Sequence, residues 1–253
     1  MAFGQEIIQN KNLKMKTVLI TGANKGIGFQ TARQLAQLSY FVFLGSRDKM
    51  KGADAIKKLK DMGISNVEFI ELDVTNIDSI QKAKQALEAK IDSLDVLINN
   101  AGISGGLPQN ISSIKIEDLR KVFDTNFFGA VQTTQQFLPL LKKSNEPRIV
   151  NVSSELGSLS VHNTTQNPNY KIYDAYSCSK TALNAFTVML ANEFGGTPFK
   201  INSVTPGYTA TDLNNFKGTE SAEKTAKVIV KYATVNSDGP TGKFFKETGE
   251  VAW

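Results

Sequence analysis

Short apolar segments alternate with longer amphipathic segments along almost the whole chain. The apolar segments lack polar alternation and predict strands buried on both faces of a sheet. We place them at 17–20, 41–44, 67–72, 96–98, 148–152, 200–204 and 244–245. Helical periodicity separates them, at 26–38, 49–62, 77–90, 116–143, 175–194 and 221–232. This order predicts an α/β fold in which right-handed crossovers build a doubly wound parallel sheet with helices on both faces.

The length and composition of the chain suit one such sheet. The chain has 253 residues, of which 41% are hydrophobic and 21% charged, and this is enough to bury a sizeable core. It contains no linker rich in Pro, Gly or Ser, no repeat and no low-complexity segment. We therefore predict a single domain over residues 1–253, in which residues 1–14 form an N-terminal extension ahead of the first strand.

Charge and residue counts argue against several classes of protein. The net charge is +5, but the lysines are scattered, which argues against a nucleic-acid partner. The sequence contains no apolar run of about 18 or more residues, so we expect no membrane span. Residues 1–14 lack the pattern of a signal peptide. The one cysteine, Cys178, excludes an intrachain disulfide, so we expect a cytoplasmic protein. The one histidine, His162, is expected in an exposed loop, and a zinc site is disfavoured.

A glycine-rich segment joins the first predicted strand to the first helix and reads Thr-Gly-Ala-Asn-Lys-Gly-Ile-Gly from Thr21 to Gly28. Glycines let the backbone turn tightly and approach a phosphate, and the helix behind them presents free N–H groups. The strand–loop–helix context favours a dinucleotide site over a mere tight turn. The residues that we expect at the cofactor are Gly22, Asn24, Lys25, Gly26, Ile27 and Gly28.

The end of the second predicted strand indicates which nicotinamide cofactor is bound. An acidic residue there would bind a ribose 2′-hydroxyl, but the sequence has Arg47, which suits a 2′-phosphate, with Lys25 as a second cation. We therefore predict NADP(H). The alternative is that Arg47 is a surface charge and that Asp48 binds the ribose. Past the third strand, Asp73 is expected to accept a hydrogen bond from the adenine amino group of the cofactor. Further cofactor contacts are expected from Val74, Asn100, Ala101 and Gly102.

Tyr176 and Lys180 lie four positions apart in the helix predicted at 175–194, so they share one helix face. A neighbouring ammonium favours phenolate. We therefore expect Lys180 to lower the pKa of Tyr176 and to let the phenol exchange a proton near neutral pH. Taken alone, the pair is equally typical of an exposed helix surface. Cys178 lies between the two but off their face, and we expect a small buried residue there.

The ordered set of motifs resembles the short-chain dehydrogenase/reductase family from about Lys16 to the C-terminus. The motifs are the glycine-rich segment, Asn99 to Gly102, Ser153, Tyr176-x-x-x-Lys180 and Pro206-Gly207. The resemblance implies a Rossmann-type sheet in the order 3-2-1-4-5-6-7. It also implies a catalytic group formed by Asn126, Ser153, Tyr176 and Lys180. The amino-acid sequences of the glycine-rich segment and of residues 46–48 are similar to those of NADPH-dependent carbonyl reductases.

The resemblance assigns a role to each of these residues. Tyr176 would protonate a carbonyl oxygen as hydride arrives from the nicotinamide, and Lys180 would hold the nicotinamide ribose. Ser153 would donate a hydrogen bond to the substrate oxygen, where negative charge develops. Asn126 would hold a water that connects Lys180 to solvent. The segment after the sixth strand would contact the cofactor and then form a substrate lid, through Pro206, Gly207, Thr209, Thr211 and residues 214–217.

The expected function is that of an oxidoreductase that transfers hydride from NADPH to a ketone or aldehyde and gives an alcohol. The alternatives are a 3-oxoacyl-thioester reductase and a non-enzymatic dinucleotide-binding protein. A serine hydrolase is disfavoured because no Gly-x-Ser-x-Gly sequence occurs. The resemblance implies a homodimer or homotetramer, although the long segment 161–174 leaves a monomer open. This segment should border the substrate pocket or a subunit surface, and it contains His162, Pro168, Tyr170 and Tyr173.

Overall fold

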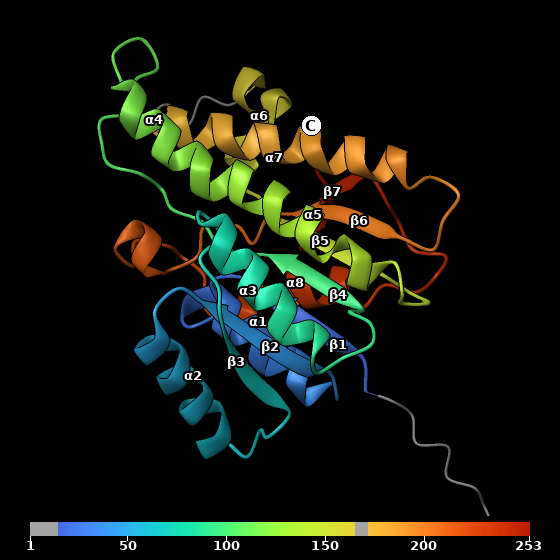
Figure 1. The fold of residues 1–253 in the computed structure, drawn as a ribbon. Coiled ribbons are helices and arrows are strands. Elements are labelled where there is room, and N and C mark those ends of the chain that lie inside the picture. The colour runs from blue at the N-terminus through green and yellow to red at the C-terminus, as the bar shows by residue number, and fades with distance from the viewer. Residues whose placement is uncertain (1–14, 165–171) are drawn as a thin grey trace, which may run out of the picture.

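The computed structural model describes residues 15–164 and 172–253, which are built around one eight-stranded sheet (Figure 1). The strands are β1 (Thr17–Ile20), β2 (Phe41–Ser46), β3 (Val67–Glu71), β4 (Val96–Asn99), β5 (Arg148–Val152), β6 (Lys200–Val204), β7 (Lys243–Lys246) and β8 (Gly249–Glu250). Their order is β3-β2-β1-β4-β5-β6-β7-β8, and the β7–β8 pair is antiparallel. The predicted parallel order 3-2-1-4-5-6-7 is confirmed, and β8 is an addition to it. The predicted extension, residues 1–14, lies outside the described residues.

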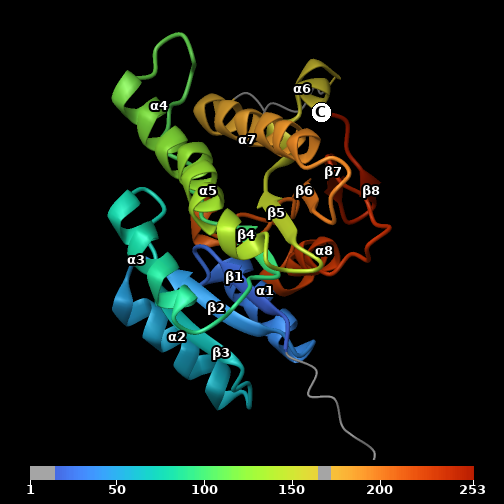
Figure 2. The same cartoon turned by 45° about the vertical axis from the view of Figure 1, so that its right-hand side comes forward.

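Helices cover both faces of the sheet, as Figures 1 and 2 show. They are α1 (Gly26–Gln37), α2 (Lys49–Asp61), α3 (Ile77–Glu88), α4 (Ile116–Phe123), α5 (Gly129–Leu141), α6 (Leu159–Thr164), α7 (Asp174–Glu193) and α8 (Ala222–Ala233). The buried side chains of α1, α2 and α8 form one apolar core with the sheet, and those of α3, α5 and α7 form another. Among the described helices, none is both long and apolar enough to cross a membrane.

The strands contribute to both cores because successive side chains of a strand point to opposite faces of the sheet. In β1, Val18 and Ile20 pack into the core beneath α1, α2 and α8, whereas Leu19 packs into the core on the other side. In β4, Ile98 and Leu97 divide in the same way. Each fully buried aliphatic side chain stabilises the fold by about 1.5–3 kcal/mol. Burial on both faces is why these strands read as unbroken apolar runs in the sequence.

The long helix predicted at 116–143 is interrupted in its middle. A π-helical turn, η1 (Asp124–Phe128), joins α4 to α5. Such turns are rare and occur frequently at functional sites. Asn126 lies inside this turn, and its side chain is buried.

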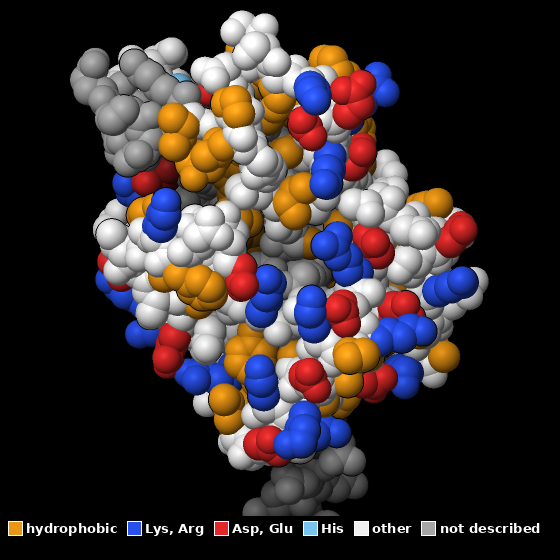
Figure 3. All heavy atoms as spheres, turned by 90° about the vertical axis from the view of Figure 1, so that its left-hand side faces the viewer, with side chains coloured by type: hydrophobic (Ala, Val, Ile, Leu, Met, Phe, Trp, Pro, Cys, Tyr) orange, Lys and Arg blue, Asp and Glu red, His pale blue; other side chains and the backbone are white. Residues whose placement is uncertain are grey.

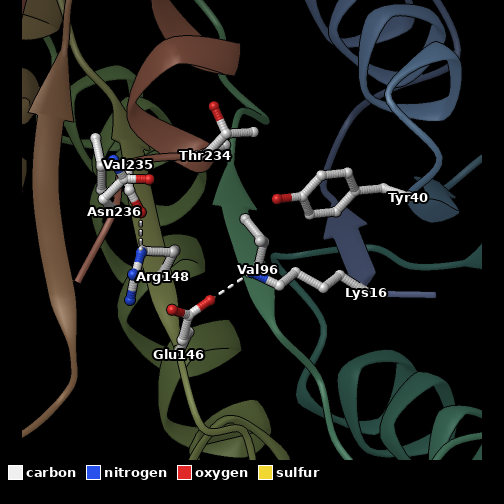
Figure 4. A pocket seen from close by; sticks show the side chains of 9 residues that line it. Lys16, Tyr40, Val96, Glu146, Arg148, Thr234, Val235 and Asn236 are labelled. Atoms are coloured by element: carbon white, nitrogen blue, oxygen red, sulfur yellow. Dashed lines mark hydrogen bonds and ion pairs between the residues drawn. The ribbon is translucent and has the colours of Figure 1, made fainter. Parts of the chain in front are cut away.

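Two hollows border the sheet, one at its amino-terminal edge and one along its edge strand β3. One is a cavity of about 50 Å³ at the amino-terminal edge of the sheet (Figure 4). There Arg148 donates hydrogen bonds to the carbonyls of Pro147, Pro198 and Val235, which ties the starts of β5 and β6 to the chain after α8. The other is an open groove of about 650 Å³ along the edge strand β3, between α2 and α3.

Candidate active site

The carboxyl ends of the central strands bring the predicted site residues to one edge of the sheet. The glycine-rich segment follows β1, Asn100 follows β4, Ser153 follows β5 and Pro206 lies just past β6. This edge faces the viewer in Figure 3, where the surface is hollowed near its centre. Hydrophobic side chains gather above the hollow, and Lys and Arg side chains lie beside and below it. Ligands of open α/β sheets bind at this edge.

Lys180 lies deep in this edge, and only 3% of the residue is exposed. Its Nζ donates a hydrogen bond to the carbonyl of Val152 at 2.8 Å and lies 5.6 Å from the centre of the Tyr176 ring. The two residues expected to share a helix face therefore do so on α7. Burial lowers the pKa of Lys180 from 10.5 to about 8, because the charged form loses its hydration. This ammonium titrates close to the neutral range.

The pKa of Tyr176 moves in the direction opposite to the one expected. Desolvation of the phenol raises its pKa from 10.0 to about 12, and a side-chain hydrogen bond with Ser154 offsets only part of this rise. The expectation of a lowered Tyr176 pKa is therefore wrong, because burial of the phenol is the largest influence on it. The phenol keeps its proton throughout the neutral pH range, as a proton donor requires.

The serine that contacts the phenol of Tyr176 is Ser154, the residue after the expected one. Ser153 is buried, and its hydroxyl is directed to the main-chain carbonyl of Lys180 at 3.5 Å. Ser154 is partly exposed, caps the short 3-10 helix η2 (Glu155–Gly157) and hydrogen-bonds the phenol. Successive residues of an extended chain point to opposite sides. A step of one residue therefore moves the hydroxyl from the protein interior to a partly exposed position.

Asn126 uses its side chain to fix the loop that follows β4. Its Oδ1 accepts a hydrogen bond from the N–H of Ile103 at 2.8 Å. Its Nδ2 donates to the carbonyl of Ile103 at 2.9 Å and to the hydroxyl of Ser179 at 3.0 Å. The Ser179 hydroxyl donates in turn to the carbonyl of Tyr176 at 2.7 Å. The Asn126 amide thus bonds the loop through Ile103 and helix α7 through Ser179. The role of Asn126 in holding a water stays a prediction.

The glycine-rich segment is held in one shape by Thr21 and Asn100. The Thr21 hydroxyl accepts from the N–H groups of Asn100 and Ala101 at 3.0 and 2.9 Å. The Asn100 amide donates to the carbonyls of Thr21 and Gly22 at 2.8 and 3.1 Å. Gly22 has a φ of +63°, and a Cβ on Gly28 would lie 2.5 Å from the Asn100 amide nitrogen, so both positions require glycine. Helix α1 then begins without a side-chain cap.

Two charged residues, Arg47 and Asp48, follow each other at the end of β2, and only Asp48 caps a helix. Asp48, the alternative ribose ligand, is the N-cap of α2 and accepts from the N–H of Lys51 at 3.0 Å. This hydrogen bond lowers the pKa of Asp48. Arg47, the residue before it, is exposed. Lys25, the second expected cation, is paired with Asp212 at 3.2 Å.

Asp73 and Val74 follow β3, where the sequence predicts contacts with the adenine side of the cofactor. The Asp73 Oδ1 accepts from the N–H and the hydroxyl of Thr75 at 2.9 and 2.7 Å. Val74 is buried, and its carbonyl accepts from the side chain of Gln132. These bonds fix the turn between β3 and α3, while the contact of Asp73 with adenine stays a prediction.

The segment after β6, which the sequence predicts to be the substrate lid, contacts the glycine-rich segment. Thr209 and Glu220 form a parallel bridge that closes the base of the lid. A Cβ on Gly26 would lie 3.6 Å from the Thr211 side chain, so the lid and the start of α1 are in close contact. Phe216, near the tip, is 65% exposed and has a φ of +59°, which is unusual for a bulky residue. Strained backbone of this kind is frequent in segments that clamp ligands.

Three expectations outside this group have other outcomes. Cys178 is exposed on α7, not buried. His162 is part of α6 rather than a loop, and its Nε2 lies 2.8 Å from the carbonyl oxygen of Leu156. Pro168 and Tyr170, expected beside the substrate pocket, lie outside the described residues.

Comparison with known proteins gives the chain clear relatives. The family described as short chain dehydrogenase matches residues 16–222. (+)-Neomenthol dehydrogenase of Capsicum annuum is 32% identical over 305 aligned positions, which cover 93% of this chain and 96% of that protein. Salutaridine reductase of Papaver bracteatum is also 32% identical, over 98% of this chain and 99% of that protein. The crystal structure of NADPH-bound carbonyl reductase from chicken fatty liver superposes with a TM-score of 0.82 at 26% identity, over 95% of this chain and 100% of that chain.

Proposed function

Because the chain belongs to the short chain dehydrogenase family of oxidoreductases, we propose that it transfers hydride from NADPH to the carbonyl carbon of a bulky, apolar ketone. The observation that carries this proposal is the arrangement at the carboxyl edge of the sheet. There the protonated phenol of Tyr176 is hydrogen-bonded to Ser154, and the Lys180 ammonium lies 5.6 Å from the centre of its ring. A proton donor, a hydroxyl and a cation thus converge beside a glycine-rich segment.

The residues around the hollow fit a dinucleotide. A Cβ on Gly22 would lie 2.9 Å from the Cα of Ala101, so this part of the segment presents bare backbone. The first N–H groups of the uncapped helix α1 and its partial positive charge suit a pyrophosphate. A Cβ on Gly102 would lie 3.6 Å from the Nζ of Lys180, so the chain after β4 leaves the ammonium room for ribose hydroxyls. Nζ has three N–H donors, one of which bonds Val152.

Proton transfer in this scheme starts from the phenol of Tyr176. When bound, the nicotinamide supplies the hydride that reduces the carbonyl carbon. The Tyr176 O–H proton moves to the carbonyl oxygen, which becomes the alcohol oxygen, and the tyrosine is left as phenolate. A pKa of about 12 keeps the proton on the phenol until the more basic alkoxide develops. The Lys180 ammonium stabilises the phenolate electrostatically.

We assign the oxyanion hydrogen bond to Ser154 in place of Ser153. Its hydroxyl is partly exposed and bonds the Tyr176 phenol, so a substrate oxygen that reaches the phenol also reaches this hydroxyl. A donor aimed at the position where charge develops stabilises the transition state more than the ground state. The buried Ser153 hydroxyl is directed away, to the carbonyl of Lys180.

The preference for NADPH rests on Arg47. Its guanidinium is exposed where β2 ends, whereas the carboxylate of Asp48 is used to cap α2. The N–H of Ala23 donates to the carbonyl of Gly45 at 2.9 Å, which holds the glycine-rich segment against the end of β2. Lys25 and Arg47 each follow this contact by two residues, so two cations flank the place of a 2′-phosphate.

The test of this preference is the charge reversal Arg47→Asp. It should weaken NADPH binding by at least tenfold and leave NADH binding unchanged or tighter, because only the 2′-phosphate loses its partner. Dissociation constants from quenching of protein fluorescence measure both. Equal losses for the two cofactors, or no loss for NADPH, would show that Arg47 does not bind the 2′-phosphate.

Exposed apolar side chains in the loop after β4 and in the lid indicate the substrate class. Leu107, Ile111, Leu213 and Phe216 are all more than 40% exposed and come from the loop after β4 and from the lid. The N–H of Ile111 donates a hydrogen bond to Oδ2 of Asp174, on the first turn of α7, at 3.1 Å. This loop therefore lies beside the helix that carries Tyr176. Two relatives are named for neomenthol and salutaridine, which are bulky ring compounds. A cyclic ketone of similar size suits this surface.

The activity is tested by NADPH oxidation with a panel of carbonyl compounds. The panel contains menthone, polycyclic ketones, small aldehydes and an acyl-carrier 3-oxo thioester. We expect the cyclic ketones to be the best substrates, and Tyr176→Phe to abolish turnover while NADPH still binds. Normal turnover by Tyr176→Phe would refute the assigned proton donor. Preference for the thioester would replace the proposed substrate with an acyl carrier.

A further inference from the structure

Gln109 is a buried polar residue in the loop between β4 and α4, and it is only 1% exposed. A carboxamide buried to this degree must have hydrogen-bond partners for its oxygen and its nitrogen. Both are provided by main-chain atoms. Nε2 donates to the carbonyl of Ser104 at 2.6 Å, and Oε1 accepts from the N–H of Tyr176 at 3.1 Å.

The loop is shaped around this carboxamide. Gly105 has a φ of +79°, and a Cβ there would lie 3.0 Å from the Nε2 of Gln109 and 2.7 Å from the side chain of Val122. Glycine is therefore required at position 105, both for its backbone conformation and for the space that the amide takes. The position of Gln109 is a fixed feature of the fold.

The Tyr176 N–H is a donor that helix α7 cannot satisfy by itself. The first N–H groups of a helix lack an acceptor in the preceding turn. Tyr173, at the N-cap, gives no side-chain cap, and the main-chain bond from Ser177 N–H to Tyr173 carbonyl is made one residue after Tyr176. Gln109, 67 positions away in the sequence, supplies the missing acceptor for Tyr176. Its bond fixes the backbone that carries the phenol.

Tyr176 is therefore held at two points. Ser154 hydrogen-bonds the phenol at the end of the side chain, and Gln109 accepts a hydrogen bond from the main-chain N–H of the same residue. A relay of hydrogen bonds continues from Gln109 toward the lid. The Ser104 carbonyl accepts from Gln109, and the Ser104 hydroxyl donates to the carbonyl of Leu213 at 3.0 Å.

We propose that Gln109 is the positioning residue of Tyr176, fixing its main chain for proton transfer and linking it through Ser104 to the lid. This role rests on the proposed function, in which the Tyr176 phenol gives up a proton. Gln109 acts through the tyrosine and the loop and does not touch the substrate. Loss of its acceptor lets the first turn of α7 shift, and a misplacement of about 1 Å at a reacting group lowers the rate by about 100-fold.

Two substitutions remove the bond to Tyr176 and a third retains it. Gln109→Met keeps the volume but has no acceptor, and Gln109→Asn keeps the carboxamide but withdraws it by one methylene group. Both should lower kcat by about 100-fold while the Kd for NADPH changes less than about twofold, because the glycine-rich segment is untouched. Gln109→Glu keeps the shape of the side chain, and burial keeps its carboxyl protonated, so one oxygen accepts from the Tyr176 N–H and the O–H donates to the Ser104 carbonyl. This variant should restore most of kcat.

The matched control is Gln34→Met on α1. Gln34 also bonds a main-chain carbonyl through its amide, that of Glu223 at 2.8 Å, but on the other face of the sheet. It should change thermal stability without changing kcat. Amide hydrogen exchange at Tyr176 gives a readout independent of activity, and exchange should accelerate in Gln109→Met and Gln109→Asn but not in Gln109→Glu.

Three results would overturn the positioning role. One is a kcat within about threefold of the wild type in Gln109→Met and Gln109→Asn. Another is an equal loss of kcat in Gln34→Met, and a third is a folded Gln109→Glu protein without recovery of kcat. If Tyr176→Phe, assayed in parallel, abolishes turnover, these failures concern Gln109 alone. If Tyr176→Phe keeps turnover, the proposed function and the role of Gln109 fall together.

Discussion

Replacement of Lys180 by methionine should stabilise the protein at neutral pH while it removes the group that the reaction needs. The ammonium is almost completely buried, and its Nζ has the Val152 carbonyl as a neutral acceptor. Burial lowers its pKa from 10.5 to about 8, so the folded state at pH 7 holds a charge that is poorly hydrated. Methionine fills a similar volume without this charge. Residues that serve function often reduce stability in this way.

The size of the effect follows from the difference between the two pKa values. One unit of pKa corresponds to about 1.4 kcal/mol, so the buried charge lowers the free energy of unfolding by about 3 kcal/mol at pH 7. The variant also loses the hydrogen bond to Val152, which contributes about 1 kcal/mol. The net gain for Lys180→Met is therefore about 2 kcal/mol at pH 7.

The gain must depend on pH in one direction. Between the folded pKa of about 8 and the unfolded value of 10.5, the unfolded state binds more protons than the folded state. Wild-type stability from this group therefore rises with pH across that window. The advantage of Lys180→Met should shrink from about 2 kcal/mol at pH 7 to about zero near pH 10.

Urea unfolding of both proteins from pH 7 to pH 10 measures this difference, because all other titrating groups cancel between wild type and variant. The exposed Lys82 on α3 provides the control, because Lys82→Met makes the same substitution at a lysine that is not buried. A difference between Lys180→Met and wild type that stays flat over this range would refute the reasoning. So would a variant that is less stable than wild type at pH 7.

Three shorter predictions concern the reaction itself. Ser154→Ala should lower kcat by about 100-fold, because a donor to the developing oxyanion is lost, whereas Ser153→Ala should stay within a few-fold; the reverse ranking would contradict the assignment. The reduction rate should fall as the pH rises through about 8, where the Lys180 ammonium loses its proton, and a flat profile from pH 7 to 9 would argue against its role. Asp212→Asn releases Lys25 from its ion pair, and NADPH should bind about threefold more tightly while NADH binding is unchanged, as titration of both cofactors would show.

The fold was predictable because its signals are local. Apolar runs buried on both faces gave the seven parallel strands, and the helix expected at 26–38 is observed at Gly26–Gln37. The strand β8 (Gly249–Glu250) is too short to leave a pattern. The π-helical turn at Asp124–Phe128 was not predicted either, because one extra residue in a single turn changes the helical periodicity of apolar residues too little to be detected in the sequence.

The candidate site was predictable in composition more than in geometry. The glycine-rich segment, Tyr176 and Lys180 were identified from spacing, and they lie at one edge of the sheet. The choice between Ser153 and Ser154 depends on how the chain leaves β5 and enters a 3-10 helix. Gln109 carried no sequence signal, because its importance lies in a partner 67 positions away.

The sequence by itself determined the sheet, the order of its strands and the chemical types gathered at its carboxyl edge, because periodicity and motif order are properties of neighbouring residues. Only the tertiary structure decided how those groups behave. The sequence predicted that Lys180 lowers the pKa of Tyr176, yet packing against distant segments raises it to about 12 and lowers that of Lys180 to about 8. Burial depends on the whole fold, and it is the largest influence on both pKa values.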